Sequence, residues 1–235
     1  MRLAWRAHLT LLVCSATFFP HNVAEAAPKI HIVAFGKWTS AEWYPDTGTK
    51  DDKPLILKIR PLIVDGRVRE YTLSVPHEVT DRLFVVRRVF RVNDSLPDQT
   101  GNPRWRWQRG GWLLVDRMTG RISAVNLPEF DAFYSSTSWY RDYAAYCGVS
   151  DDGKKTYAIV AQLNRRKPVL KKPLSDEGVP DDAGPDSGCP APVWQRGPVR
   201  VSFESAGSGA KQTFSLRGHI VDLVNDSDDD EDASK

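Results

Sequence analysis

"LILKIRPLIVDGRVREYTLSV", from Leu55 to Val75, is the stretch that decides the fold class. Two runs with strand composition flank Asp65-Gly66, a pair that readily adopts the positive φ angles of a tight hairpin turn. Pro61 removes a backbone donor from the first run, which favours an edge strand or a bulge at that point. The stretch therefore predicts two antiparallel strands joined by a short turn.

The rest of the chain also consists of short strand-forming runs. Helical periodicity is hard to find, whereas short β-branched and aromatic runs broken by turn residues recur. "DRLFVVRRVFRV" (81–92) predicts a long strand that is buried on both faces or bulged near Arg87 and Arg88. In "RWRWQRGGWLLVDRMTGRISAVNLP" (104–128), Gly110-Gly111 and the turn at 116–120 predict a meander of three short strands.

These patterns predict an all-β protein of antiparallel meanders and hairpins. A β-sandwich, an irregular barrel and a partially propeller-like arrangement all fit them. We expect one domain over residues 27–224. Within it, residues 164–198 hold seven prolines between Lys167 and Pro198 and predict a long Pro-rich loop.

Both ends of the chain differ from this domain. Residues 1–26 open with two arginines, continue through an apolar stretch and reach small residues at Ala24 and Ala26, which is the plan of a secretory signal peptide. We therefore expect a periplasmic or extracellular protein without a transmembrane span. A lipid anchor at Cys14 is the alternative, but the bulky Val13 precedes it where a small residue is expected. Residues 225–235 hold six acids and one lysine and predict a disordered, solubilising tail.

Cleavage of that leader leaves two cysteines, Cys147 and Cys189. An even pair in an oxidising compartment predicts one disulfide, which would pin the Pro-rich loop to the strand that carries Cys147. Two buried free thiols are the alternative.

Two turns resemble those of β-propeller blades. "YCGVSDDGKKTYAIV" (146–160) is similar to the S-x-D-G-K hairpin of TolB-like propellers, and "WLLVDRMTGRI" (112–122) resembles a D-x-x-T-G blade turn. In that family these residues are structural, so the resemblance implies hairpins and no catalytic role. A blade takes about 40 to 45 residues, and the turns of this chain are unequally spaced, so the sandwich and barrel alternatives stay open. As a whole, the chain resembles only uncharacterised secreted bacterial proteins.

Motifs of known chemistry are absent from the sequence. It has no G-x-S-x-G elbow, no H-E-x-x-H, no C-x-x-C, no Walker loop and no dinucleotide fingerprint. "PHEVTD" (76–81) brings His77, Glu78 and Asp81 together, which suits a metal or proton shuttle but equally an ordinary polar turn. We therefore predict no cofactor, no metal ligand and no catalytic residue.

Aromatic and basic residues crowd together in "NPRWRWQRGGW" (102–112) and "SWYRDY" (138–143). On an extended strand the two tryptophans at 105 and 107 share one face and the arginines at 104 and 106 share the other. Such a surface can stack a sugar or an extended peptide, although the rings can equally fill the core. The candidate binding residues are Trp105, Trp107, Arg104, Arg106, Trp112, Trp139 and Tyr140.

The functional prediction is an exported, non-catalytic binding or scaffold module of the cell envelope or exterior. Its expected partner is a protein, a peptide or a glycan. The alternative is an exported hydrolase whose site assembles only in three dimensions. The exported location and modest net charge argue against a nucleic-acid partner.

Overall fold

The computed structural model describes residues 30–45, 54–95, 101–175, 179, 184–205, 209–217 and 220–223. Within these ranges every strand pairing is antiparallel and no residue is helical, which confirms the predicted all-β class. The same ranges accordingly contain no helix of the length and apolarity that a membrane crossing needs. The predicted leader with Cys14 and the predicted acidic tail lie outside the described residues.

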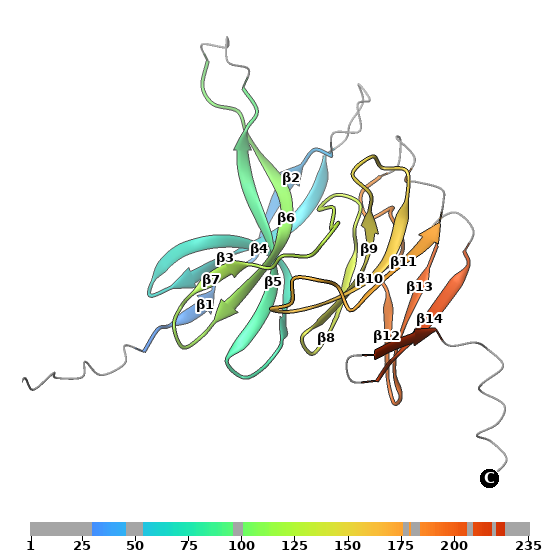
Figure 1. Cartoon of the computed structure of the whole chain (residues 1–235). Helices are drawn as coiled ribbons and strands as arrows, with labels where there is room; N and C mark the ends of the chain where they lie inside the picture. The colour runs from blue at the N-terminus through green and yellow to red at the C-terminus, as the bar shows by residue number, and fades with distance from the viewer. Residues whose placement is uncertain are drawn as a thin grey trace, which may run out of the picture.

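The strands form three sheets (Figure 1). The large sheet contains β1 (Val33–Phe35), β2 (Thr39–Trp43), β3 (Leu55–Val64), β4 (Arg67–Glu78), β5 (Leu83–Asn93), β6 (Trp105–Asp116) and β7 (Ile122–Ala124). The second sheet contains β8 (Thr137–Tyr140), β9 (Tyr143–Val149), β10 (Thr156–Gln162) and β11 (Leu170–Ser175). The third sheet contains β12 (Val193–Arg196), β13 (Val199–Glu204), β14 (Lys211–Arg217) and β15 (Ile220–Leu223).

The predicted hairpin at Asp65-Gly66 joins β3 to β4 in the large sheet. Asp65 and Gly66 have φ angles of 51° and 75°, the left-handed values that a two-residue hairpin turn requires. The Asp65 carboxylate also accepts a hydrogen bond of 3.1 Å from the backbone N–H of Ile32. The turn residue thus fastens the chain before β1 to the end of the hairpin.

The large sheet is curled and has a hydrophobic core on each of its two faces (Figure 1). Leu62 belongs to one core and Ile59 to the other, and the same relation holds between Val86 and Val89. Residues three apart on a strand point to opposite faces. The long strand β5 is therefore buried on both faces, one of the two arrangements that the sequence suggested.

Gly110-Gly111 lies inside β6, and the prediction that it separates two short strands is wrong. Between the pairs Arg87↔Trp112 and Val89↔Arg109 the β6 strand has one more residue than β5, which is a β-bulge. A bulge bends a strand without ending it. One long strand therefore replaces the two short ones expected here.

The second and third sheets pack face to face. Their shared core is formed by small residues of β9 and β10, such as Ala145 and Ala158, against large residues of the third sheet, such as Phe203 and Phe214. Both sheets are four-stranded antiparallel meanders, an arrangement that propeller blades also use. The S-D-D-G-K stretch forms the predicted turn between β9 and β10, with Gly153 at a φ of 70°. The family resemblance itself stays a prediction.

The predicted disulfide joins Cys147 on β9 to Cys189, with 6.0 Å between the two Cα atoms. Both cysteines are buried in the core between the second and third sheets. The segment around Cys189 is therefore attached to β9, as the sequence predicted. A buried disulfide indicates an oxidising, extracytoplasmic setting.

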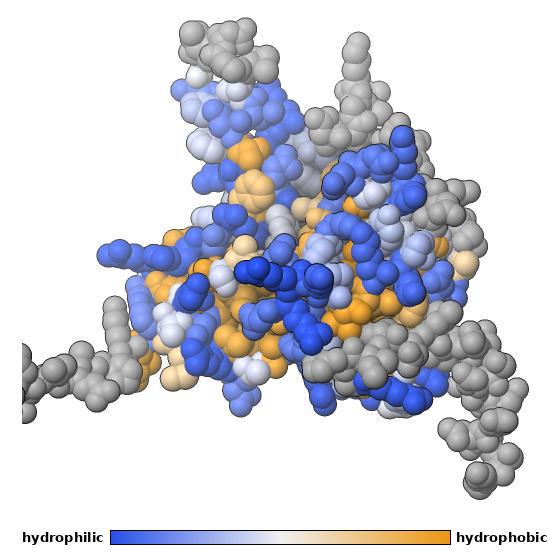
Figure 2. All heavy atoms as spheres, viewed as in Figure 1, coloured by the Kyte–Doolittle hydropathy of each residue, from blue (hydrophilic) through white to orange (hydrophobic). Residues whose placement is uncertain are grey.

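Residues 164–198 are not one loop, because the range includes β11 and β12. β11 pairs with β10 at the edge of its sheet, where Lys171, Lys172 and Pro173 are tolerated because no further strand needs their backbone groups. Composition alone hides such an edge strand. Figure 2 shows hydrophobic side chains on the visible surface over the large sheet, whereas the part of the β5–β6 hairpin just below its grey tip is mainly hydrophilic.

Candidate functional site

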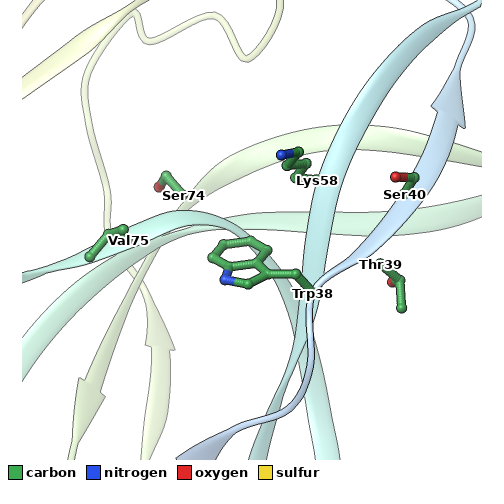
Figure 3. Close-up of a pocket in the computed structure, with 6 residues that line it drawn as sticks. All are labelled: Trp38, Thr39, Ser40, Lys58, Ser74 and Val75. Carbon is green, nitrogen blue, oxygen red and sulfur yellow. The ribbon is translucent and has the colours of Figure 1, made fainter.

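An open pocket on the large sheet is the strongest candidate site (Figure 3). It has a volume of about 520 Å³, within the range of roughly 300 to 1,000 Å³ typical of ligand pockets. β2 and the residue before it, β3 and β4 all contribute to its wall. The lining residues are Trp38, Thr39, Ser40, Lys58, Ser74 and Val75, and we call this the Trp38 pocket.

One wall of the Trp38 pocket is a bulge in β4. Between the pairs Leu73↔Arg87 and His77↔Val85, the β4 strand carries two more residues than β5. Ser74 in this bulge has a φ of 60°, a conformation that non-glycine residues rarely adopt. Val75 is consequently 75% exposed although it lies in mid-strand. Strained residues of this kind often mark binding sites.

The indole ring of Trp38 stands in the middle of the pocket (Figure 3). On one side it is held by Arg60, whose guanidinium carbon lies 4.4 Å from the Trp38 ring centroid and 3.9 Å from that of Phe35. Cation–π attraction fixes the ring in this position. Trp38 lines the pocket and is still 44% exposed, so part of its indole is available to a ligand.

The pocket is positively charged. Lys58 and Arg60 are two residues apart on β3 and so project from the same face. Neither makes an ion pair with any described residue, and the Arg60 Nε has no hydrogen-bond partner among them. Desolvation by burial lowers the pKa of Arg60. Among the described lining residues, no carboxylate offsets the charge of Lys58.

Hydroxyl groups supply the remaining polarity. Thr39 donates a hydrogen bond of 3.4 Å to the carbonyl oxygen of Ile59. In the described part of the chain the hydroxyls of Ser40 and Ser74 form no such bond and face the pocket region on either side of Lys58 (Figure 3). The pocket thus combines an aromatic ring, an ammonium group and two hydroxyls. These groups suit ligand binding better than proton transfer.

Of the predicted binding residues, Trp105 and Trp107 lie on the β5–β6 hairpin. Trp105 is 58% exposed, whereas Trp107 packs against Tyr71 with 5.1 Å between ring centroids. Arg91 lies over the Trp107 ring at 5.1 Å. Trp105 is therefore a surface residue, and Trp107 is part of the core on that side of the sheet.

The two predicted arginines of this hairpin share one carboxylate. Arg104 and Arg106 form ion pairs with the Asp94 carboxylate at 3.2 and 2.8 Å. Arg106 also lies over the Tyr44 ring at 5.0 Å. These contacts connect the two arms of the hairpin, and the single acid offsets one of the two positive charges.

The other three predicted residues lie between sheets. Trp112 is buried against Trp139, with 5.3 Å between ring centroids, and its Nε1 donates to the Thr137 hydroxyl at 3.3 Å. Tyr140 stacks on Trp194 at 5.4 Å, which joins the second sheet to the third. The structure does not bring the seven predicted residues onto one surface. They divide between a hairpin and two internal junctions.

Of the His77, Glu78 and Asp81 cluster, the first two residues end β4 and Asp81 lies in the bend that follows. Arg117 donates hydrogen bonds of 2.7 and 2.8 Å to the Glu78 carboxylate, and these bonds lower the pKa of Glu78. His77 shares a hydrogen bond of 2.8 Å with the carbonyl oxygen of Arg141. Throughout the described ranges, no three His, Cys, Asp or Glu side chains gather closely enough to hold a metal ion.

A second cavity, of about 450 Å³, lies beside the β3–β4 turn. Its lining is mainly polar and includes Arg67, Arg69 and Thr119. His31 Nδ1 lies 2.9 Å from the Asp65 carboxylate on its rim, so an acid already accompanies its cations. Without an aromatic face, this cavity is the weaker candidate.

The sequence analysis did not find the Trp38 pocket. Trp38 stands alone in "FGKWTS". Lys58 lies on a later strand, and Ser74 lies beyond the Asp65-Gly66 turn. Only the pairing of β2, β3 and β4 brings them together. A lone tryptophan between two short edge strands is the sole sequence signal for it.

Comparison with known proteins adds no relative: no protein-family model, no curated protein and no solved structure matches this chain.

Proposed function

We propose that this protein is a non-catalytic binding module of the cell envelope or exterior that holds a glycan or an extended peptide in the Trp38 pocket. The observation that carries the proposal is the partly exposed Trp38 ring in an open, cationic pocket. Aromatic rings beside a few convergent polar groups are typical of ligand sites.

The pocket chemistry supports binding over hydrolysis. Hydrolysis usually requires a general acid or base within hydrogen-bond reach of the substrate. Among the described residues that line the Trp38 pocket, Lys58 is the only one whose side chain titrates. Three acids elsewhere on the large sheet pair with arginines, namely Asp116 with Arg82, Glu70 with Arg88 and Glu78 with Arg117. A fourth, Glu42 on β2, accepts a hydrogen bond from the Tyr44 hydroxyl.

The location of the protein rests on two supports. The buried disulfide fits an oxidising compartment. The arginines, apolar stretch and small residues of positions 1–26 fit an export leader. Mass spectrometry of the protein recovered from its native cell would identify the mature N-terminus. A retained leader in a cytosolic fraction would contradict this part of the proposal.

Ligand arrays followed by calorimetric titration test the function. The mature, oxidised protein is screened against glycans and peptides, and each hit is titrated into wild type, Trp38→Ala and Trp105→Ala. Both tryptophans are exposed, so neither substitution should unfold the protein. We expect Trp38→Ala to weaken binding about tenfold or more and Trp105→Ala to have a smaller effect.

Two results would contradict the proposal. One is unchanged affinity in Trp38→Ala for every array hit. The other is cleavage of a hit, seen as product masses after incubation with the wild type and not with heat-denatured protein.

A further inference from the structure

We propose that the natural ligand of the Trp38 pocket is an acidic sugar, a pyranose ring that carries a carboxylate within a longer glycan. This inference rests on the binding function proposed above and names the class of ligand. Three features of the pocket carry it: a partly exposed aromatic ring, the ammonium group of Lys58 and a set of hydroxyls.

The aromatic face selects a ring-shaped ligand. Arg60 covers one side of the Trp38 indole at 4.4 Å, and Trp38 is 44% exposed where it lines the pocket. The apolar C–H face of a pyranose can stack on such a surface, as other flat groups do on tryptophan. Val75, on the far side of the pocket, adds a small apolar contact at the edge of the ring (Figure 3).

The charge selects an acid. Among the described residues, Lys58 has no anionic partner and the pocket lining has no carboxylate. Arg60, next to the pocket, adds a second positive charge on the same face of β3, and its Nε donor is buried without an acceptor in the described part of the chain. A carboxylate beside Lys58 would form a charge-assisted hydrogen bond. A neutral sugar would leave the charge of Lys58 uncompensated.

The hydroxyls favour a sugar over a peptide. Ser40 and Ser74 both line the pocket, and neither bonds to another described residue. Side-chain hydroxyls both donate and accept, which matches the hydroxyl groups around a sugar ring. An extended peptide is instead recognised mainly through backbone hydrogen bonds at a strand edge. The Trp38 pocket offers side chains from three strands.

The test compares matched charged and neutral ligands. A panel of oligouronates of different stereochemistry is titrated into the mature protein beside the methyl ester of each, which has the same rings without the charge. We expect at least one oligouronate to bind about tenfold tighter than its ester. Raising the salt concentration should reduce this preference.

Matched lysine variants assign the preference to the pocket. Lys58→Gln should remove the preference for the acid over the ester. Lys172→Gln, on an exposed lysine of β11 outside the pocket, should retain the preference. Thermal melts of the three proteins confirm that each variant is folded.

The outcomes separate this inference from the function beneath it. Equal affinity for acid and ester, a preference that survives Lys58→Gln, or no binding of any oligouronate overturns the acidic-sugar inference. If a peptide or a neutral glycan from the arrays then binds and loses affinity in Trp38→Ala, the binding function stands without it. If no ligand of any kind depends on Trp38, both fail.

Discussion

Arg109 on β6 holds Asp186 through two hydrogen bonds of 2.8 and 2.6 Å, although 77 positions separate the two residues. The Ser136 hydroxyl donates a third, of 3.0 Å, to the same carboxylate, and a guanidinium nitrogen of Arg87 lies 3.9 Å away. We call these four residues the Asp186 latch. Because Asp186 is three positions before Cys189, the latch connects the large sheet to the segment that the disulfide attaches to β9.

Asp186→Asn should lower the free energy of unfolding by about 2 kcal/mol. The side chains of Arg87 and Arg109 are 10% and 8% exposed. Removing the charge of Asp186 leaves these two nearly buried cations with Asp131 as a weaker anionic neighbour of Arg87. Breaking a buried pair costs about 3 to 5 kcal/mol, and an exposed pair at most about 1 kcal/mol. The Asp186 side chain is 43% exposed, which places it between these cases.

Urea denaturation at pH 7 measures the change. Glu204→Gln, on an exposed acid of β13, is the matched control and should shift stability by less than about 0.5 kcal/mol. Equal effects of the two substitutions would show that the latch adds nothing to stability.

Acidification should remove the contribution of the latch. Burial by itself would raise the pKa of Asp186, but the hydrogen bonds and charge of Arg109, with Ser136 and Arg87, outweigh it and lower that pKa below its ordinary value. A carboxyl group with a depressed folded pKa stabilises the fold above its unfolded pKa of about 3.9, and this stabilisation is lost as the pH falls through the folded pKa.

The pH profile of Asp186→Asn checks this sign. The stability difference between wild type and variant should be full at pH 6 to 7 and shrink steadily below about pH 4. Arg87 stays charged throughout, since burial and repulsion from Arg109 lower its pKa only to about 10. A difference that is constant from pH 7 to pH 3 would rule out titration of Asp186 as the cause.

Local patterns in the sequence were sufficient to predict the class of fold. The Asp65-Gly66 turn and the stretch around Gly153 are hairpins because their residues adopt the required φ angles whatever the rest of the chain does. Gly110-Gly111 has equal turn character, yet it bulges inside β6 because pairing with β5 continues on both sides. Tertiary pairing decided that case, and no local pattern reports it.

The candidate site could not be predicted in the same way. Trp105 and Trp112 are similar in sequence context, but one is 58% exposed and the other 8% exposed, because Trp112 lies where the second sheet covers β6. The position of the Trp38 ring depends on its contact with Arg60, which the pairing of β2 with β3 brings close. Exposure and cation–π contacts depend on which sheets meet, and that information is spread over the whole chain.

Removing the disulfide should lower stability by about 4 kcal/mol. On the chain-entropy model, the 42 positions between Cys147 and Cys189 set the size of the loop that the bond closes in the unfolded state. The variant to measure is Cys147→Ala with Cys189→Ala, against oxidised wild type in urea. Alkylation of both thiols in native protein without reductant would show instead that the bond does not form.

The disulfide and the latch should also be coupled. Both restrain the residues between Asp186 and Cys189, so the loss from removing both is expected to differ from the summed single losses by more than about 0.5 kcal/mol. A double-mutant cycle with Asp186→Asn provides the number. Strict additivity would mean that the two attachments act on independent parts of the structure.

Gly148→Ala should destabilise the protein by about 1 to 3 kcal/mol, because a methyl group at this position has no room. A Cβ there would meet the Ile159 side chain, and it would come within 3.2 Å of both the Cβ and the carbonyl oxygen of Glu129. That carbonyl accepts a hydrogen bond of 3.0 Å from the N–H of Val149, so the neighbouring loop cannot withdraw without breaking it.

Gly111→Ala is the matched control, since Gly111 also lies within a strand but has nothing within 4 Å of the added Cβ. It should be neutral or slightly stabilising, because alanine restricts the unfolded chain more than glycine does. Urea midpoints of the two variants, measured under the same conditions, provide the comparison. If Gly148→Ala were as stable as Gly111→Ala, the close packing of β9 against the Glu129 loop, and with it the position of the second sheet beside the large one, would have to be revised.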